Sequence, residues 1–557
     1  MIGLLQARAI AQVRRGSHRA AALACTPSAR AFDAALADVR GAQEERLAEV
    51  LRLVEGTEQA RRLGLQPGLS PQAFRERVPA CRYSDVAAAI ERQRQGMPGQ
   101  LTRARCPRYQ PTSGSSDRLK WIPYPAAFLA QLDAAISPWG RDLYRRFPGI
   151  AQGRHYWSLS WMPTNLRAAT ATNVNDDRAL LSWSKRAFTA MTAPVPAWVT
   201  STASSDESLF ATLCFLAAAA DLSVLSVWSP TFALNLCEQL GVQREAVIEA
   251  LDQERRSSRW SSRHPQLPGA PPRSLRGAQI LRSWNGKMDP AFFRELWPSL
   301  GLVSAWDTST SARWAGALRR LLPHAQFQGK GLWATEGVVT IPYRDQYPLA
   351  VRSHFIEFVD LDDNKPRFPW ELRVGQAVRP LLTTGAGLLR YALNDRLVVR
   401  GFLGTTPCFE FLGRLDDVDM VGEKMSPETA RAALDAIAGG DDVCRPLTLL
   451  AVTQLRDADK PSYVALCEGP RGPADQRRDA RLDDALRGAF HYNLARDLGQ
   501  LGPARVLTVA DARGLYQALG EARGMVAGNI KVEALLLCDD ERAATLLRDR
   551  ISEGTHP

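Results

Sequence analysis

The feature that most restricts the fold of this chain is an alternation of apolar runs and helical stretches between residues 190 and 320. The apolar runs are residues 197–200, 222–228 and 302–306, and the helical stretches include 209–220 and 311–322. Such alternation predicts an α/β body in which helices pack on a sheet. The hydrophobic content of 45% and the lack of a sustained repeat exclude a disordered chain, collagen and a coiled coil.

The segments on either side of this region differ from it. The first hundred residues indicate helices, with apolar spacing of three and four over 31–55 and a further helix over 87–95 capped by Ser84-Asp85. Residues 338–399 change to short strands, of which 355–358 and 397–399 are the clearest. Together these segments predict one large body with an α/β centre.

After Arg414 the chain becomes acidic and its pattern changes again. Residues 415–557 carry a net charge of −6, whereas residues 1–414 carry +17. Ser426-Pro427 begins a helix, and another is expected near 479–498. Strand-like runs occupy 447–452, 463–467, 506–509 and 532–537. We therefore predict a body of residues 1–414 and a small α+β domain of residues 415–557, with a glycine hinge at Gly413.

Several classes of protein are disfavoured by composition. Nine cysteines are scattered without a CxxC pair, which is typical of a reduced intracellular protein and disfavours a metal–thiolate site. The longest apolar stretch, 209–220, is too short to cross a bilayer. The first 24 residues lack the apolar core of a secretory signal, and an amphipathic organelle-targeting peptide is the weaker reading. We expect a cytoplasmic protein that contacts neither membrane nor nucleic acid.

The densest basic stretch, which argues against this expectation, runs from Arg255 to Arg276 in a loop rich in proline and serine. It contains a single aromatic residue, Trp260, so it lacks the repeated stacking positions of a single-strand binder. A solvated surface loop is the favoured interpretation. Nucleic-acid binding stays as an alternative, and it predicts an affinity that falls steeply with salt.

A first candidate for chemistry is the hydroxyl-rich segment Thr112-Ser113-Gly114-Ser115-Ser116, followed by Lys120. Small residues around a glycine allow backbone N–H groups to approach phosphate oxygens, and the hydroxyls donate further hydrogen bonds. The segment is not the GxxxxGK[ST] pattern, and by itself it is equally typical of a plain flexible loop.

Two acidic residues follow in later motifs. Glu336 lies in Trp333-Ala334-Thr335-Glu336-Gly337, where its carboxylate is suited to a hard cation that also holds phosphates. Asp395 opens a valine-rich strand, where it is suited to accept the hydroxyls of a ribose. An ordinary turn is the competing interpretation of each.

The last candidates lie around and after the hinge. Phe411-Leu412-Gly413-Arg414 precedes Gly422-Glu423-Lys424, and Lys531 follows Gly528-Asn529-Ile530 near the end. A lysine on a mobile lid would neutralise charge that develops on a transferring phosphoryl group. A solvated surface lysine is the competing interpretation.

In their order and spacing these motifs resemble the adenylate-forming superfamily, and specifically the acyl-acid amido synthetases of the plant auxin-conjugating type and their bacterial relatives. The resemblance extends over nearly the whole chain. The segments that carry it are 57–64, 101–124, 304–306, 334–337, 355–358, 383–395, 409–414 and 422–424.

The resemblance implies a two-step reaction in which ATP and a carboxylic acid give an acyl-adenylate, which an amine, typically an amino acid, then attacks. It assigns phosphate binding to the segment from Thr112 to Ser116, and nucleotide contacts to Trp333, Ala334 and Thr335. Glu336 would bind Mg²⁺, Asp395 the ribose, and Arg414 would lie at the hinge. Lys424 and Lys531 would act from the lid, Lys531 in the adenylation step. ATP and Mg²⁺ are the implied cofactors, and we expect a monomer.

The chain departs from the family pattern at two places. Asp117 and Arg118 follow the hydroxyl-rich segment where the family has a small residue, and Ala392 replaces an arginine in the motif before Asp395. These departures keep a degenerate nucleotide-binding scaffold as one alternative. An acyl-CoA or carrier-protein ligase of the same superfamily, in which a thiol replaces the amine, is another. The acyl acid itself is not identified by the sequence, although its pocket is expected near Trp306. Candidate aromatic walls are Trp157, Trp161, Trp183 and Trp228.

Overall fold

The structure is a computed structural model of the chain. It describes residues 2–111, 120–158, 188–189, 191–252, 260–261, 267–414, 418, 420–421, 423, 425–438, 444–453, 460–470, 476–497, 500–523, 525, 530–538 and 541–552. The chain divides into two compact units, and the division falls between Leu412 and Gly413.

The first unit begins with helices, as the sequence predicts. They are α1 (Ile2–Ala24), α2 (Thr26–Ala37), α3 (Val39–Val54), α4 (Glu58–Arg62), α5 (Pro71–Arg77) and α6 (Tyr83–Arg94). The segment expected as one helix over 31–55 is broken at Asp38, whose side chain accepts a hydrogen bond from Gly41 N and starts α3 as its N-cap. The cap predicted for the 87–95 helix is also placed differently, because Asp85 lies inside α6 and accepts from Arg82 N.

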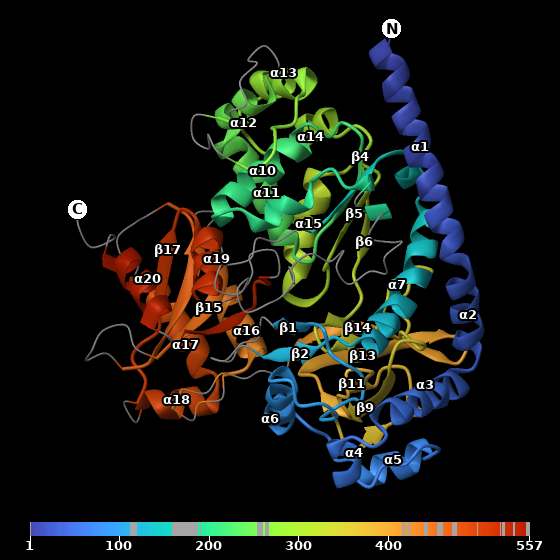
Figure 1. Cartoon of the computed structure of the whole chain (residues 1–557). Helices are drawn as coiled ribbons and strands as arrows, with labels where there is room; N and C mark the ends of the chain where they lie inside the picture. Colours follow the sequence, from blue (N-terminus) through green and yellow to red (C-terminus); the bar gives the residue numbers. More distant parts are fainter. Residues whose placement is uncertain are drawn as a thin grey trace. The chain divides into compact units, whose positions relative to one another are not determined.

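A four-stranded parallel sheet forms the centre of this unit (Figure 1). Its strands follow chain order: β3 (Arg154–Trp157), β4 (Leu222–Ser226), β5 (Leu302–Ala305) and β6 (Gln326–Gly329). The runs at 222–228 and 302–306 are strands as predicted. The run at 197–200 is not, because it forms the 3₁₀ helix η3 (Ala197–Ser201), which follows Pro196 in a segment where prolines disfavour a ladder.

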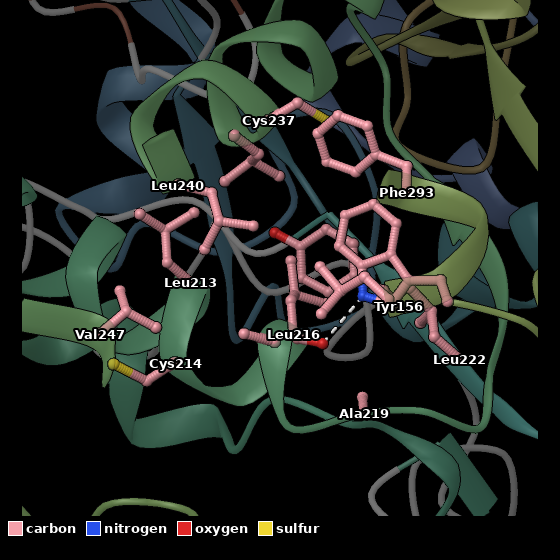
Figure 2. Packing of buried hydrophobic residues seen from close by; sticks show 14 of the residues in the cluster. Tyr156, Leu213, Cys214, Leu216, Ala219, Leu222, Cys237, Leu240, Val247 and Phe293 are labelled. Atoms are coloured by element: carbon pink, nitrogen blue, oxygen red, sulfur yellow. Dashed lines mark hydrogen bonds between the residues drawn. The ribbon is translucent and has the colours of Figure 1, made fainter. Parts of the chain in front are cut away.

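The two faces of the parallel sheet pack against different cores. Tyr156, Leu225 and Val303 are Cα partners, and they belong to a cluster built mainly by the helices beside the sheet. Figure 2 shows Tyr156 among other members of this cluster. These helices are α10 (Ser205–Ala217), α11 (Pro230–Val242), α12 (Arg244–Leu251), α13 (Leu275–Ser283), α14 (Pro290–Leu296) and α15 (Ala312–Leu321). Val224 and Leu302 point to the opposite face, into a second core that includes α7 (Ala126–Arg146).

The second core also contains an antiparallel sheet of order β10-β9-β11-β13-β14, with β12 paired to β11. Its strands are β9 (Phe355–Asp360), β10 (Pro366–Arg367), β11 (Ala377–Thr383), β12 (Tyr391–Ala392), β13 (Asp395–Leu403) and β14 (Thr406–Arg414). Two short hairpins accompany it, β1 (Tyr109–Pro111) with β2 (Trp121–Pro123), and β7 (Trp333–Ala334) with β8 (Gly337–Val338). The remaining 3₁₀ helices are η1 (Pro148–Gln152), η4 (Ser309–Ser311) and η5 (Pro369–Glu371).

The second unit is an α+β domain, as predicted. Its sheet has the order β17-β16-β15-β18, in which β15 pairs antiparallel with β16 and the outer pairs are parallel. The strands are β15 (Arg445–Val452), β16 (Ser462–Glu468), β17 (Arg505–Val509) and β18 (Leu535–Cys538). The helices are α16 (Pro427–Ala438), α17 (Gln476–Arg487), α18 (Phe490–Asp497), α19 (Ala512–Ala522) and α20 (Glu541–Ser552). The helix expected over 479–498 is two helices, because the chain turns at Gly488-Ala489.

Across the part of the chain that the structure describes, no helix combines the length and the apolar composition needed to cross a membrane.

Candidate nucleotide and acyl-acid site

Glu336 lies in the two-residue turn of the β7–β8 hairpin. Trp333 pairs with Val338 and Ala334 with Gly337, so Thr335 and Glu336 are the residues between the strands. The glycine after them has a packing reason, since a Cβ atom at Gly337 would lie 2.7 Å from His354 Nε2. The local sequence thus forces the carboxylate into a tight turn that lies against the core.

Two tyrosines hold this turn in place. The Tyr124 hydroxyl donates a hydrogen bond to the carbonyl oxygen of Thr335 at 2.8 Å, and the Tyr391 hydroxyl donates to Glu336 Oε1 at 3.1 Å. Both tyrosine side chains are buried. Sequence reasoning placed each of them inside a motif but gave neither a role, because a partner 55 or 211 residues away leaves no local signal.

The electrostatic environment of Glu336 links three of the sequence motifs. Burial raises the pKa of Glu336, and the negative charge of Asp395 raises it further. The hydrogen bond from Tyr391 and the positive charge of Lys120 lower the same pKa. Because these effects fall with distance, the structure brings Glu336, Asp395 and Lys120 into one neighbourhood.

The segment from Thr112 to Ser116 lies outside the described residues, as do Asp117 and Arg118. The structure describes the two strands that flank this segment, β1 and β2. They pair with each other, and Pro111 lies opposite Trp121. Trp121 N donates to the Tyr83 hydroxyl at 2.9 Å. Burial is the largest cause that raises the pKa of Tyr83, and the charge of Glu336 contributes to it. The base of the β1–β2 hairpin therefore lies beside the Glu336 turn.

The donors around Glu336 fit a magnesium ion that arrives with a nucleotide. The described residues contain no group of three or more His, Cys, Asp or Glu side chains able to hold a metal ion by themselves. Mg²⁺ usually takes one or two protein carboxylates and completes its shell with water and phosphate oxygens. The Glu336 carboxylate, whose pKa is raised by the nearby charge of Asp395, would supply a ligand of this kind, and a bound cation would favour its deprotonated form.

The other nucleotide-motif residues have defined positions. Asp395 is the first residue of β13 and is half-buried. Trp333, Ala334 and Thr335 are also half-buried, directly before the carboxylate. Arg414 is the last residue of β14, at the point where the chain enters the second unit.

Lys424 lies outside the described residues, but the residue before it has a clear structural role. The buried Glu423 carboxylate accepts hydrogen bonds from Met420 N at 3.0 Å and from Val421 N at 2.8 Å. It also accepts a hydrogen bond of 2.5 Å from the Tyr463 hydroxyl. Sequence reasoning quoted Glu423 only as part of a motif, whereas the structure shows that it anchors the segment that carries Lys424.

Lys531 is anchored through its backbone. The Tyr516 hydroxyl, from α19, donates to the Lys531 carbonyl oxygen at 3.1 Å and accepts from Glu533 N at 3.0 Å. Tyr516 is buried, so these two bonds fix the chain just before β18.

Tryptophans gather at the carboxyl end of the parallel sheet in the first unit. Trp157 and Trp228 are both in this group, while Trp161 and Trp183 lie outside the described residues. The ring-centroid separations are 5.8 Å for Trp139–Trp157, 6.0 Å for Trp139–Trp333, 5.8 Å for Trp228–Trp306 and 5.9 Å for Trp228–Trp333. Because Trp333 immediately precedes Ala334-Thr335-Glu336, this tryptophan group adjoins the Glu336 turn.

The basic stretch shows no stacking platform in its described part. Trp260 is fully buried, packs 5.6 Å from Trp198 and donates from Nε1 to the Gly269 carbonyl oxygen. The Arg276 guanidinium binds the Leu296 carbonyl oxygen at 3.2 Å. These residues belong to the core and its edge. Trp260 is therefore not exposed to stack on a nucleic-acid base.

Comparison with family models gives two matches. The GH3 family N-terminal domain matches residues 28–327, and the GH3 family central domain matches residues 347–414.

Curated relatives come from Oryza sativa subsp. japonica. One, "Probable indole-3-acetic acid-amido synthetase GH3.6", is 25% identical in an alignment of 270 positions, which covers 43% of this chain and 54% of that relative. This chain thus spans about half the length of that protein. Another, "Probable indole-3-acetic acid-amido synthetase GH3.12", is 23% identical in an alignment of 590 positions, gaps included, which covers 93% of this chain and 94% of the relative.

Solved structures agree on the architecture. "GH3.15 acyl acid amido synthetase" superposes with a TM-score of 0.73 at 17% identity, over 92% of this chain and 94% of the other. "AtGH3.15 acyl acid amido synthetase in complex with 2,4-DB" gives 0.74 at 18% identity, over 94% and 95%. The predicted fold, an α/β body with a small C-terminal α+β domain, is therefore confirmed.

Proposed function

Because this chain belongs to the GH3 family, we propose that it is an ATP-dependent ligase that joins a carboxylic acid to an amine through an acyl-adenylate. An amino acid is the expected amine, since the curated relatives are named as amido synthetases of an acid. The acid named for those relatives, indole-3-acetic acid, is not carried over to this chain.

The observation that supports the proposal best is the convergence on Glu336. Its carboxylate is fixed by Tyr391, its turn is fixed by Tyr124, and Asp395 and Lys120 act on its pKa. A triphosphate with its cation needs this combination of a fixed carboxylate, a nearby lysine and a second carboxylate for the sugar. Under this proposal Glu336 ligates Mg²⁺, Asp395 binds the ribose and Trp333, Ala334 and Thr335 line the nucleotide.

In the first step a carboxylate oxygen of the acid attacks the α-phosphorus of ATP, and the bond to the bridging oxygen breaks to release pyrophosphate. When bound, Mg²⁺ supplies positive charge to the phosphate oxygens. The residues of this chain position the reactants, with Thr112, Ser113, Gly114, Ser115 and Ser116 as proposed phosphate donors and Lys531 as the proposed cation for the developing charge.

In the second step the amine nitrogen attacks the acyl carbon, the bond to the AMP oxygen breaks, and the nitrogen loses a proton. Lys424 and Lys531 belong to the second unit, and Arg414 lies at its start. Rotation of that unit about Gly413 would exchange the groups facing the two steps, and the φ of 135° at Gly413 is suited to glycine.

The test is to incubate the protein with ATP, Mg²⁺ and a panel of carboxylic acids and amino acids, to measure pyrophosphate release and to identify products by mass. We expect pyrophosphate that depends on the acid, and an amide that depends on both substrates. A thioester formed with coenzyme A in place of an amide would favour the thioester-forming alternative. ATP binding without pyrophosphate release for any acid would favour the scaffold.

The matched variant is E336Q, because glutamine keeps the oxygen that accepts from Tyr391 but removes the charge. Loss of such an electrostatic contact typically lowers the rate by about 10²–10³-fold. We expect a loss of this size in pyrophosphate release with an unchanged melting temperature. Wild-type rates in E336Q would remove Glu336 from the proposed site.

A further inference from the structure

One row of polar side chains crosses the parallel sheet near its carboxyl end. Trp157, Ser226, Ser304 and Gln328 are successive Cα partners across β3, β4, β5 and β6. Side chains that lie side by side in neighbouring strands point to the same face. The adjacent row beginning at Tyr156 enters the helical core, so the polar row lies on the opposite face. Ligands of open α/β sheets bind at this end of the strands.

Three members of this row keep a buried polar atom without a hydrogen-bond partner among the described residues. These atoms are Trp157 Nε1, Ser304 Oγ and Gln328 Nε2. The side chains of Ser304 and Gln328 are only 1% and 6% exposed. An unpartnered buried polar group is costly and rare, which points to a ligand group that satisfies it.

Each of the three unpartnered atoms is able to donate a hydrogen bond. An indole Nε1 only donates. Trp139 of α7 donates from its own Nε1 to Gln328 Oε1 at 2.9 Å, which orients the amide and leaves Gln328 Nε2 as a donor. The Ser304 hydroxyl is able to donate as well. A site built from donors selects a hydrogen-bond acceptor.

Lys330 adds positive charge at the same place. Its Nζ donates to Ser226 Oγ in the row at 2.9 Å, and it lies 4.6 Å from the Trp228 ring centroid and 5.3 Å from that of Trp139. Aromatic faces attract an ammonium and hold it in place. Lys330, Trp228 and Trp333 are each half-buried, so a planar molecule has access to the aromatic faces and the ammonium.

We propose that the acyl acid is aromatic and carries a second carboxylate at the end remote from the carboxyl that is adenylated, and that Lys330 and the polar row bind this second group. The inference rests on the proposed function and specifies its substrate class. The carboxyl that is adenylated must lie near Glu336, so the other end of the acid is the end that reaches Lys330. Trp333 lies between Lys330 and Glu336 in the sequence and packs on Trp228 and Trp139, which places the aromatic rings between the two ends.

The experiment compares three acids of one shape: 3-phenylpropanoate, its 4-carboxy derivative and the 4-methyl ester of that derivative. Pyrophosphate release gives kcat and KM for each with wild-type protein and with K330M. Because a hydrogen bond to a charged group contributes about 1.5–3 kcal/mol, we expect wild type to favour the 4-carboxy acid by roughly tenfold or more in kcat/KM. K330M should lose that preference through KM and should keep its rates with the other two acids.

Two further variants complete the design. K287M removes an exposed lysine of the same unit and should behave as wild type. S226A removes the hydroxyl that holds the Lys330 ammonium and should reduce the preference for the 4-carboxy acid in the same direction as K330M. Thermal unfolding shows whether each variant is folded, and a K330M protein that does not fold leaves S226A to decide.

Two results would overturn the inference. One is a wild type without preference for the second carboxylate, and the other is an equal loss for all three acids in K330M, which would assign Lys330 to the reacting carboxyl or to stability. If no acid gives pyrophosphate, the proposed function fails, and calorimetric binding of the 4-carboxy acid without ATP then decides the inference. Binding to wild type but not to K330M supports it, and no binding to wild type rejects it.

Discussion

Glu336 illustrates how its surroundings set the charge of a single residue. Its carboxylate is held in a hairpin turn, burial and Asp395 raise its pKa, and Tyr391 and Lys120 oppose that rise. A cation binds only the deprotonated form. Under the proposed function the proton and the metal would compete for this one side chain, and the hydrogen bond from Tyr391 favours the charged form that a metal would need.

The first prediction concerns Y391F, which removes the hydroxyl that lowers the pKa of Glu336. Without it the carboxyl binds its proton more tightly, so activity should be lost at a higher pH as the solution is acidified. Pyrophosphate release measured against pH should show the acidic limb moved upward in Y391F, and raised Mg²⁺ should move it back. Y124F is the matched control, because Tyr124 contacts the Thr335 carbonyl oxygen and not the carboxylate. An unmoved limb in Y391F would contradict the prediction.

The sequence indicated some of these residues and not others. Glu336, Asp395 and the lid lysines are chemically distinctive residues within short motifs, so their roles are open to prediction. Tyr391, Tyr124 and Lys330 act through partners that are remote in sequence, such as Ser226, 104 residues from Lys330. No local pattern records such pairs, because only the folded sheet brings them together.

At the scale of elements, a buried charge cluster ties the N-terminal helices to the antiparallel sheet. Glu357 in β9 is 1% exposed, and its carboxylate binds Arg75 of α5 at 2.9 Å and Arg390 at 2.8 Å. Arg390 also donates to the Val78 carbonyl oxygen at 2.6 Å. These contacts hold Arg390 in a left-handed conformation with φ of 49°, directly before Tyr391, so the cluster positions the residue that supports Glu336.

The second prediction is that E357Q destabilises the protein, because it leaves the buried Arg390 guanidinium without its carboxylate and leaves the half-buried Arg75 with only Glu371, at 3.8 Å. Removing one partner of a buried ion pair typically costs about 3–5 kcal/mol. The free energy of unfolding from denaturant titration should fall by this amount. E44A, which removes an exposed i,i+4 partner of Arg40, should change it by only about 0.3–0.5 kcal/mol. Equal effects of the two substitutions would reject the buried-cluster account.

A histidine pair joins α1 to the parallel sheet. The His18 and His155 rings lie 4.4 Å apart, and both side chains are buried. Burial lowers the pKa of His155 to about 3, with a further contribution from His18, and burial also lowers the pKa of His18. Each ring is held by a backbone carbonyl oxygen, Gly153 for His18 and Ile150 for His155.

The third prediction follows from the sign of these shifts. Unfolded histidine titrates near 6.5, so between about pH 6.5 and 3 the unfolded chain binds more protons than the folded one. The contribution of His155 to stability is therefore complete above about pH 6.5 and is lost as the pH falls. H155Q should reduce the slope of unfolding free energy against pH by up to about 1.4 kcal/mol per unit in this range. Identical slopes for wild type and H155Q would count against it.

At the scale of the whole molecule, the chain consists of a basic body and an acidic C-terminal unit. The change of composition indicated a separate C-terminal unit, and the regular alternation indicated the α/β centre. The helix breaks at Asp38 and Gly488 were not predicted from the sequence. The apolar spacing of a helix continues across both positions, and only the local capping and turn geometry ends each helix. The strand expected at 197–200 failed because prolines outweighed its apolar residues.

The fourth prediction concerns the cooperation of the two units. K531M should lower pyrophosphate release by about 10²-fold, because it removes a cation proposed to face the transferring phosphoryl group. Amide formation from a preformed acyl-adenylate should be retained, since that step does not need this charge. Y516F, which frees the Lys531 backbone, should give a smaller loss in the same assay. Unchanged pyrophosphate release in K531M would contradict the role of Lys531.

The tryptophans at the carboxyl end of the parallel sheet have a photophysical consequence. Successive rings in the series Trp157, Trp139, Trp333, Trp228 and Trp306 have centroids 5.8–6.0 Å apart. Excitation energy absorbed by one indole therefore passes readily to the others. The emission of these five rings, out of the 14 tryptophans of the chain, thus reports on the surroundings of the most red-shifted ring in the group. An acid seated against these rings would change that emission, and occupancy would be visible in a fluorimeter without any label.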